Sequence, residues 1–323
     1  MAKNQEPMAN DELITATPTS VIGHRSLVLG HRSLAIGHPP SLPIDPIEEV
    51  NVTEDYREYQ RVAERIAEEA GALLLSFYGQ VEAREKGPAD LVTEADFASQ
   101  ELIKKRLSES FPEHTLLAEE EGAGTEYDRP WRWIVDPLDG TMNFAHTFPL
   151  WVVSIGLEHE GRLVAGVVYH PLSRATYSAS LGAGATLDGK PMRVSKVDRL
   201  EASLISTGLP TDFSADGERQ MAYMKRFSTK THSVRRTGSS ALNLAILAAG
   251  GCEVCYATQM HPWDAAAGVV LVREAGGHVS RFSGSPYDLY GREILASNGK
   301  VHQQAVEALA EAWHGDSTSE IPW

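Results

Sequence analysis

The pattern of apolar residues changes once along this chain, near residue 195, and this change restricts the fold more than any other feature. Before it, residues 152–158 and 163–169 flank a short turn, and their pattern predicts two antiparallel strands. After it, short apolar runs alternate with helical patterns. Because each apolar face must be buried against another element, we expect alternating layers of sheet and helix. Residues 53–194 are predicted to form an α+β half, and residues 195–315 an α/β half, of one unit.

Helical spacing of apolar residues predicts two helices in the first half and four in the second. The predicted helices cover residues 59–77, 94–110, 217–227, 239–249, 263–275 and 300–313. A third strand is expected at residues 175–179, and the glycine-rich stretch from Gly182 to Gly189 is expected to end the strand-rich block.

The charge balance excludes one class of partner. Lys and Arg number 29 and Asp and Glu number 44, so the net charge is 29 − 44 = −15. A chain without a basic excess is not expected to bind a nucleic acid polymer, because that binding depends on counterion release by basic residues. An acidic protein that handled phosphate esters would need metal cations to offset its own field.

The sequence also predicts a compartment. The two cysteines, Cys252 and Cys255, cannot form a disulfide framework, which is typical of a reducing environment. Their C-x-x-C spacing permits a redox role, but they fall in a predicted strand, where residues three apart point to opposite faces. No apolar run reaches about 18 residues and no secretory signal is evident, so we expect a cytoplasmic protein without membrane contact.

The first 48 residues differ from the rest. The repeat Gly-His-Arg-Ser-Leu begins at Gly23 and again at Gly30, and a proline pair follows. Glycine and proline disfavour a coiled coil, and a flexible segment loses much entropy when it gathers histidines around a metal. We therefore expect residues 1–48 to be a disordered leader.

The most informative segment joins an apolar run to two carboxylates. Asp136 and Asp139 stand three residues apart in Asp-Pro-Leu-Asp-Gly-Thr. Carboxylates at the end of a strand can converge on one hard cation, and the Leu138 carbonyl can supply a further oxygen. Gly140 and Thr141 can open a helix whose free N–H groups face a phosphate. The alternative is a polar turn with a helix cap.

Two further acidic segments favour the metal hypothesis. Glu119 follows an apolar run that can hold it at a sheet edge, although three consecutive glutamates are also typical of a solvated surface. Asp264 falls in the first turn of a predicted helix, where the helix dipole alone would favour an acid. With Asp136 and Asp139 they offer only oxygen ligands, which suit Mg²⁺ or Mn²⁺ better than Zn²⁺.

A fourth segment, from Lys86 to Asp96, precedes the second predicted helix. In one interpretation Thr93 and Asp96 only cap that helix. In the functional interpretation Asp96 and Thr141 activate a water molecule, and Lys86 is a mobile cation near the phosphate.

These segments resemble the signatures of the inositol monophosphatase family of Mg²⁺-dependent, lithium-sensitive phosphatases. The matching segments are Asp136-Pro-Leu-Asp-Gly-Thr-Met-Asn-Phe144, Trp263-Asp-Ala-Ala-Ala-Gly268 with Glu274-Ala-Gly-Gly277, Asp90-Leu-Val-Thr-Glu-Ala-Asp96, Leu117-Ala-Glu-Glu120 and Arg236-Thr-Gly-Ser-Ser-Ala-Leu-Asn243. They cover about residues 55–313, and several motifs in the same order make the resemblance specific.

The resemblance implies an αβαβα layered sandwich of the sugar-phosphatase type, with the site between the two halves, and a homodimer. It implies hydrolysis of a small phosphorylated metabolite with two or three Mg²⁺ ions, Mn²⁺ being an alternative. The implied metal ligands are Glu119, Asp136, the Leu138 carbonyl, Asp139 and Asp264, with Asp136 shared between two ions. The implied catalytic pair is Thr141 with Asp96, the implied phosphate amides are those of Gly140 and Thr141, and the implied contacts to the departing alcohol are Gly238, Ser239 and Ser240.

One position departs from the family pattern. Members that act on inositol phosphate carry an acidic residue seven positions before Asp264, where this chain has Ala257. Inositol monophosphate is still the expected substrate. Histidinol phosphate, a fructose bisphosphate and a nucleotide 3′-phosphate are alternatives, because the family uses one metal site for different alcohols.

Two other classes of protein fit the sequence less well. A haloacid-dehalogenase-like phosphatase would carry its aspartates two residues apart, whereas Asp136 and Asp139 are three apart. A non-catalytic metal-binding homologue would be favoured by loss of any metal carboxylate, of Thr141 or of Asp96, and all of them are present.

Overall fold

The computed structural model describes residues 54–80, 84–87, 90–121, 130–209 and 216–313, and the expected leader with its repeat lies outside them. The helices are α1 (Arg57–Phe77), α2 (Glu94–Ser110), η1 (Glu119–Glu121), α3 (Thr141–Ala145), η2 (Leu200–Ala202), α4 (Gly217–Lys230), α5 (Ser240–Ala248), α6 (Pro262–Glu274) and α7 (His302–Ala312). The strands are β1 (Arg84–Gly87), β2 (Asp90–Val92), β3 (Thr115–Ala118), β4 (Trp131–Asp139), β5 (Val152–His159), β6 (Arg162–His170), β7 (Ala175–Ser180), β8 (Gly184–Leu187), β9 (Lys190–Pro191), β10 (Leu204–Gly208), β11 (Ser233–Arg235), β12 (Val254–Thr258), β13 (His278–Ser280) and β14 (Glu293–Ser297).

The larger sheet has seven strands in the order β3-β4-β5-β6-β7-β8-β9. The pair β3–β4 is parallel, and the other pairs are antiparallel. Helices α1 and α2 pack on one face of it, where Leu74, Trp133 and Ile155 belong to one buried cluster. Almost every residue of β5 and β6 is buried, because helices cover both faces of the sheet.

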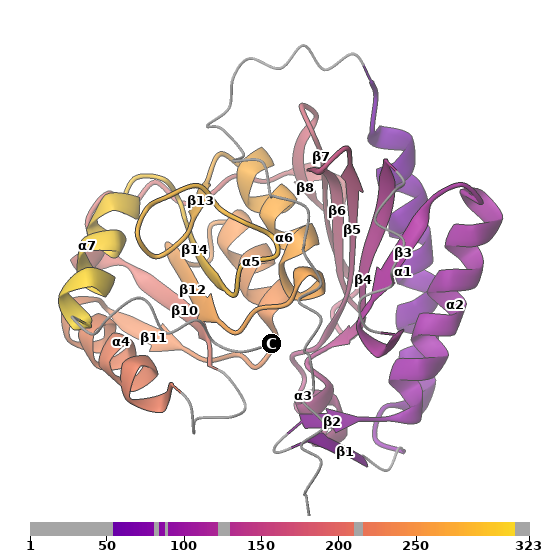
Figure 1. Cartoon of the computed structure of the whole chain (residues 1–323), viewed down its shortest axis with the longest axis horizontal. Helices are drawn as coiled ribbons and strands as arrows, with labels where there is room; N and C mark the ends of the chain where they lie inside the picture. Colours follow the sequence, from indigo (N-terminus) through magenta and orange to yellow (C-terminus); the bar gives the residue numbers. More distant parts are fainter. Residues whose placement is uncertain (1–53, 81–83, 88–89, 122–129, 210–215, 314–323) are drawn as a thin grey trace, which may run out of the picture. The chain divides into compact units, whose positions relative to one another are not determined.

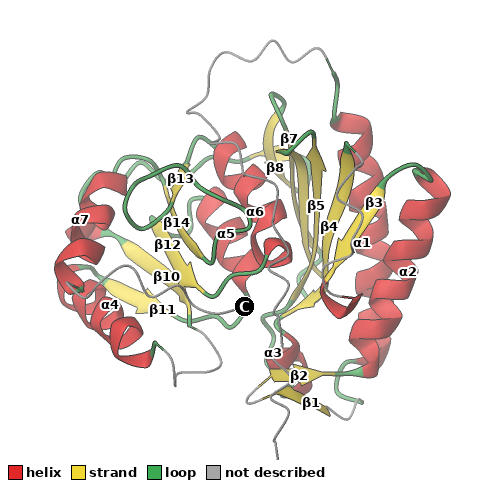
Figure 2. Cartoon of the chain, in the orientation of Figure 1, coloured by secondary structure: helices red, strands yellow, loops and turns green. Residues whose placement is uncertain are grey.

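The smaller sheet has five strands in the order β11-β10-β12-β14-β13. Helices α5 and α6 contact each other and both sheets, while α4 and α7 contact each other and the strands β11 and β14 (Figures 1 and 2). The layers therefore run helix, sheet, helix, sheet, helix, and the predicted αβαβα sandwich is confirmed.

Helix α6 lies directly on the larger sheet because two strand residues have no side chain. A Cβ atom placed on Gly166 would lie 2.5 Å from the Ala267 carbonyl oxygen, and one on Gly156 would lie 2.7 Å from the Ala266 Cβ. Real side-chain atoms do not approach so closely, so these glycines set the depth at which α6 sits. They thereby place the first turn of α6, which carries Asp264, against the sheet.

Two expectations from the sequence are wrong. The strand-rich block does not end at Gly182, because β8 and β9 lie within and beyond the glycine-rich stretch and extend the sheet. Cys252 and Cys255 do not lie in one strand on opposite faces: Cys252 precedes β12, and both belong to one buried cluster. Burial raises the pKa of the Cys252 thiol to about 11 and that of Cys255 to about 12, so neither forms a thiolate readily.

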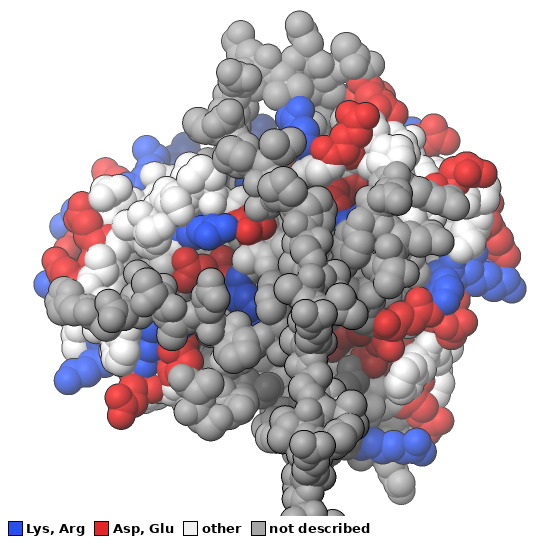
Figure 3. All heavy atoms as spheres, viewed as in Figure 1, with Lys and Arg blue, Asp and Glu red and all other residues white. Residues whose placement is uncertain are grey.

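The surface carries charges of both signs. Acidic and basic side chains are interspersed over the face drawn in Figure 3 rather than gathered into separate patches. Within the described ranges, none of the helices combines the length and the apolar character that a membrane span needs.

We predict that Gly166→Ala lowers the free energy of unfolding by about 1–3 kcal/mol, because the added methyl group overlaps the backbone of α6. Urea denaturation of the purified variant measures this. Unchanged stability would contradict direct contact between the backbones of α6 and β6.

Candidate active site

An irregularity in β4 brings two carboxylates to one side of the sheet. Asp136 pairs with Ser154 of β5, but the next paired residue, Asp139, lies opposite Val152. Three steps along β4 thus match two along β5, so β4 contains one extra residue. In a regular strand residues three apart point to opposite faces, and the extra residue restores the same face. A polar turn was the alternative interpretation of this segment, whereas β4 continues through both aspartates.

The third carboxylate comes from the helix on that face. Asp264 is the third residue of α6, and its carboxylate accepts a hydrogen bond from the His261 N–H at 2.7 Å. Asp264 therefore caps the start of α6, where the helix dipole also favours an acid. The second carboxylate oxygen of Asp264 is left for other partners.

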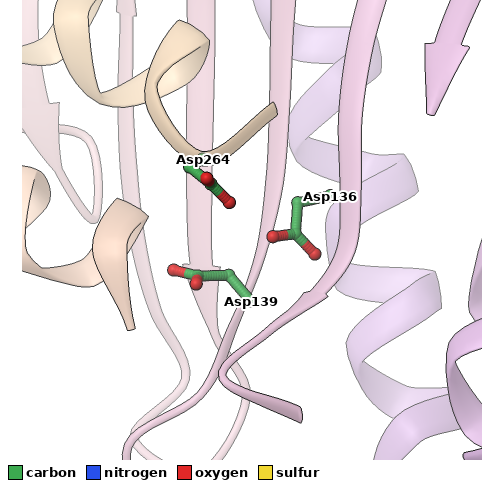
Figure 4. A group of neighbouring side chains, drawn as sticks. All are labelled: Asp136, Asp139 and Asp264. Atoms are coloured by element: carbon green, nitrogen blue, oxygen red, sulfur yellow. The ribbon is translucent and has the colours of Figure 1, made fainter. Parts of the chain in front are cut away.

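Asp136, Asp139 and Asp264 converge, each offering one oxygen within 4.8 Å of the others (Figure 4). Asp136 is 2% exposed and Asp139 7%. Burial raises the pKa of Asp136 well above its ordinary value, and the charges of Glu119 and the other two aspartates raise it further. Burial and then the charge of Asp139 likewise raise the pKa of Asp264. Asp264 is half-buried. Three carboxylates that repel one another, two of them buried, are an unfavourable arrangement without a cation.

This donor set fits a divalent metal ion. It contains only carboxylate oxygens, which hard cations such as Mg²⁺ and Mn²⁺ prefer. Glu119 begins η1, directly after β3, and is close enough to act on the pKa of Asp136 and Asp264, although it is not one of the three converging residues. Leu138 is buried between Asp136 and Asp139.

Asp139 is held by the start of α5. Its carboxylate accepts hydrogen bonds from the Ser239 hydroxyl at 2.6 Å, the Ser240 N–H at 3.1 Å and the Ala241 N–H at 2.7 Å. Burial raises the pKa of Asp139, and these hydrogen bonds oppose the rise. The Ser239 hydroxyl, predicted to contact substrate, thus has a carboxylate partner, and its role toward substrate stays a prediction.

Thr141 and Asp96 lie in direct contact. The Thr141 hydroxyl is 2.9 Å from Asp96 Oδ1 and 3.1 Å from the Leu138 carbonyl oxygen. Asp96 Oδ2 accepts from the N–H and the hydroxyl of Thr93, at 2.8 and 2.7 Å. The two interpretations of Asp96 therefore do not exclude each other, because one oxygen caps α2 and the other faces Thr141. Gly140 precedes α3 with a φ of 99°, a left-handed conformation that favours glycine.

Asn143 has contacts to which the sequence pattern assigned no role. Its side-chain amide donates to the Leu150 carbonyl at 2.6 Å and to the Thr237 carbonyl at 2.8 Å. Gly238 has a φ of +83°, and a Cβ atom there would lie 2.9 Å from that amide. Asn143 thus ties α3 to the turn before α5. In the sequence, the position of Asn143 two residues after Thr141 is the one feature that indicates a role near the site.

Ala257, Ser240 and Lys86 are the remaining residues that the sequence singled out. A Cβ atom on Gly208 would lie 3.2 Å from the Ala257 Cβ and 3.4 Å from Ser240 Oγ, so Ala257 and Ser240 are neighbours at the end of β10. The backbone of Lys86 lies in β1, and its side chain is outside the described part of the chain.

We predict that Asp136→Asn stabilises the metal-free protein at pH 7, because it removes one of three crowded charges. A raised pKa means that folding binds protons. The stability contributed by Asp136 is therefore full below about pH 4 and is lost as the pH rises through the raised pKa. Urea denaturation in chelator at several pH values compares variant and wild type. A variant less stable than the wild type at every pH would refute the repulsion.

Known proteins match most of the chain. The model of the inositol monophosphatase family matches residues 55–314. An inositol-1-monophosphatase of Synechocystis is 41% identical over 258 residues, which are 79% of this chain and 90% of that protein. Inositol monophosphatase 2 of Solanum lycopersicum is 40% identical over 263 residues, 79% and 99% of the two chains. The crystal structure of the extragenic suppressor protein suhB from Bartonella henselae superimposes with a TM-score of 0.75 at 35% identity, covering 78% of this chain and 98% of that one. The chain therefore belongs to the inositol monophosphatase family and is a phosphoric monoester hydrolase.

Proposed function

We propose that this protein hydrolyses a small phosphate monoester with Mg²⁺ bound at the acidic cluster, and that inositol monophosphate is its substrate. The convergence of Asp136, Asp139 and Asp264 carries the proposal, because so compact a group of carboxylates, two of them buried, suits a divalent cation. The family membership supports a phosphate ester as the reactant. A homodimer and a cytoplasmic location remain predictions from the resemblance and the sequence.

The metal ligands of the proposal are the three aspartates, Glu119 and the Leu138 carbonyl, which together would hold two or three ions. Mg²⁺ bound there would supply the positive charge that offsets the phosphate and the departing alcohol oxygen. The backbone N–H groups of Gly140 and Thr141, at the start of α3, are proposed to bind the phosphate oxygens.

Thr141 and Asp96 are proposed to accept the proton of the attacking water. As the water donates to Thr141 Oγ1, the Thr141 hydroxyl passes its own proton to Asp96 Oδ1, 2.9 Å away. Thr93 occupies the other oxygen of Asp96 and so fixes the orientation of this carboxylate. A hydroxyl has one proton to give, so donation to Asp96 leaves the Leu138 carbonyl oxygen for a cation.

The alcohol side of the substrate is proposed to contact Gly238, Ser239 and Ser240. Ala257, beside Ser240, offers no acceptor for a substrate hydroxyl. Histidinol phosphate, fructose 1,6-bisphosphate and a nucleotide 3′-phosphate therefore stay alternatives to inositol monophosphate. The proposed chemistry is the same for all of them, because it uses only the phosphate.

We expect the purified protein to release phosphate from inositol 1-phosphate with Mg²⁺ and not with chelator. Histidinol phosphate, fructose 1,6-bisphosphate and adenosine 3′,5′-bisphosphate are tested in parallel, and Asp264→Asn serves as a folded control without turnover. Preference for one of the alternatives would correct the substrate alone. Equal release with and without metal, or full activity of Asp264→Asn, would refute the metal assignment.

We expect Thr141→Val to lower kcat by about 10²- to 10⁴-fold, because it keeps the shape of threonine and removes the hydroxyl that contacts Asp96. Thr141→Ser keeps the hydroxyl and should retain most of the activity. Steady-state phosphate release measures both. A Thr141→Val enzyme with the kcat of the wild type would rule out the proposed proton route.

A further inference from the structure

Helix α2 turns a polar face toward the site rather than an apolar one. Ser99 and Gln100 lie about one helical turn after Asp96 on the same face, and the three residues are 0%, 3% and 0% exposed in the order Ser99, Gln100, Asp96. Polar side chains buried so completely need hydrogen-bond partners. Asp96 belongs to the catalytic pair proposed above, and the partners of the other two are backbone groups of the segments that carry metal ligands.

Ser99 acts on Asp136 through one peptide group. Its hydroxyl donates to the Pro137 carbonyl oxygen at 2.9 Å. The N–H at the other end of that peptide belongs to Leu138, and it donates to Asp136 Oδ1 at 3.0 Å. A peptide group is planar, so fixing its carbonyl also fixes the direction of its N–H. Through its bond to Pro137, 38 residues further along the chain, Ser99 therefore restrains the direction in which the Asp136 carboxylate faces.

Gln100 acts on the neighbouring acidic segment. Its side-chain oxygen accepts a hydrogen bond from the Glu120 N–H at 3.0 Å. Glu120 follows Glu119 within η1, a single short turn at the end of β3. A bond to the backbone of so short an element restrains the position of Glu119 as well.

We propose that Ser99 and Gln100 are positioning residues, which orient Asp136 and Glu119 for a divalent cation without touching it. The inference rests on the proposed function only in taking those carboxylates as metal ligands. Groups that orient metal ligands typically change metal affinity or activity by about 10- to 100-fold when they are removed.

The test measures binding of Mn²⁺ to the full chain by calorimetry, without substrate. Ser99→Ala and Gln100→Met remove the two hydrogen bonds and should each weaken Mn²⁺ binding about tenfold. Ser108→Ala on α2 and Gln303→Met on α7 are matched controls, because both side chains are exposed and bond only within their own helix. The controls should bind Mn²⁺ as the wild type does.

Thermal unfolding in chelator separates positioning from a general loss of structure. The proposal requires that Mn²⁺ affinity falls in the two variants while the unfolding midpoint of the metal-free protein moves by no more than in the controls. Wild-type Mn²⁺ affinity in both variants overturns the proposal. A loss of Mn²⁺ binding no larger than the fraction of unfolded protein in each variant also overturns it. The Mn²⁺ binding test does not depend on phosphate release. A wild-type protein that binds Mn²⁺ but releases no phosphate in the assay described above would refute the proposed reaction and leave this inference standing.

Discussion

The repulsion among three carboxylates, of which two are buried and one is half-buried, is the constraint on which the rest of the structure depends. Asp136, Asp139 and Asp264 would separate if their backbones were free to move, because each charge raises the cost of the others. They stay together because each lies on a different firmly packed position: before the extra residue of β4, after it, and at the start of α6. The glycines beneath α6 allow that helix to sit deep enough to complete the group. The fold therefore holds a charge arrangement that a bound cation relieves.

The hydrogen bonds around the site link segments from both sheets and the helices between them. Asp139 at the end of β4 accepts from three groups at the start of α5, which packs against the smaller sheet. Asn143 joins α3 to the turn before α5. Together these bonds make the position of each ligand depend on several elements, which is typical of sites that need close geometric control.

Local patterns predicted much of the fold and the chemical class of the site. Periodicity found the long helices, and the order of patterns gave the layers, because both follow from which residues must be buried. Oxygen-only ligands indicated a hard cation before their geometry was known. The extra residue in β4 was not predicted, since Asp-Pro pairs favour a turn as readily as a bulge. Ser99 and Gln100 were missed because an inward helix face was expected to be apolar, and their partners lie 38 and 20 residues away in sequence.

The position of Ala257 has a consequence for how such a protein can diversify. Ala257 belongs to β12 of the smaller sheet, whereas Asp136 and Asp139 belong to β4 of the larger one. Under the proposed function, substitutions at the end of β12 would change the contacts to the alcohol without altering the strand that carries the two acids. The proposed hydrolytic chemistry and the choice of alcohol would then depend on different sheets, so that one could change in evolution while the other stays the same.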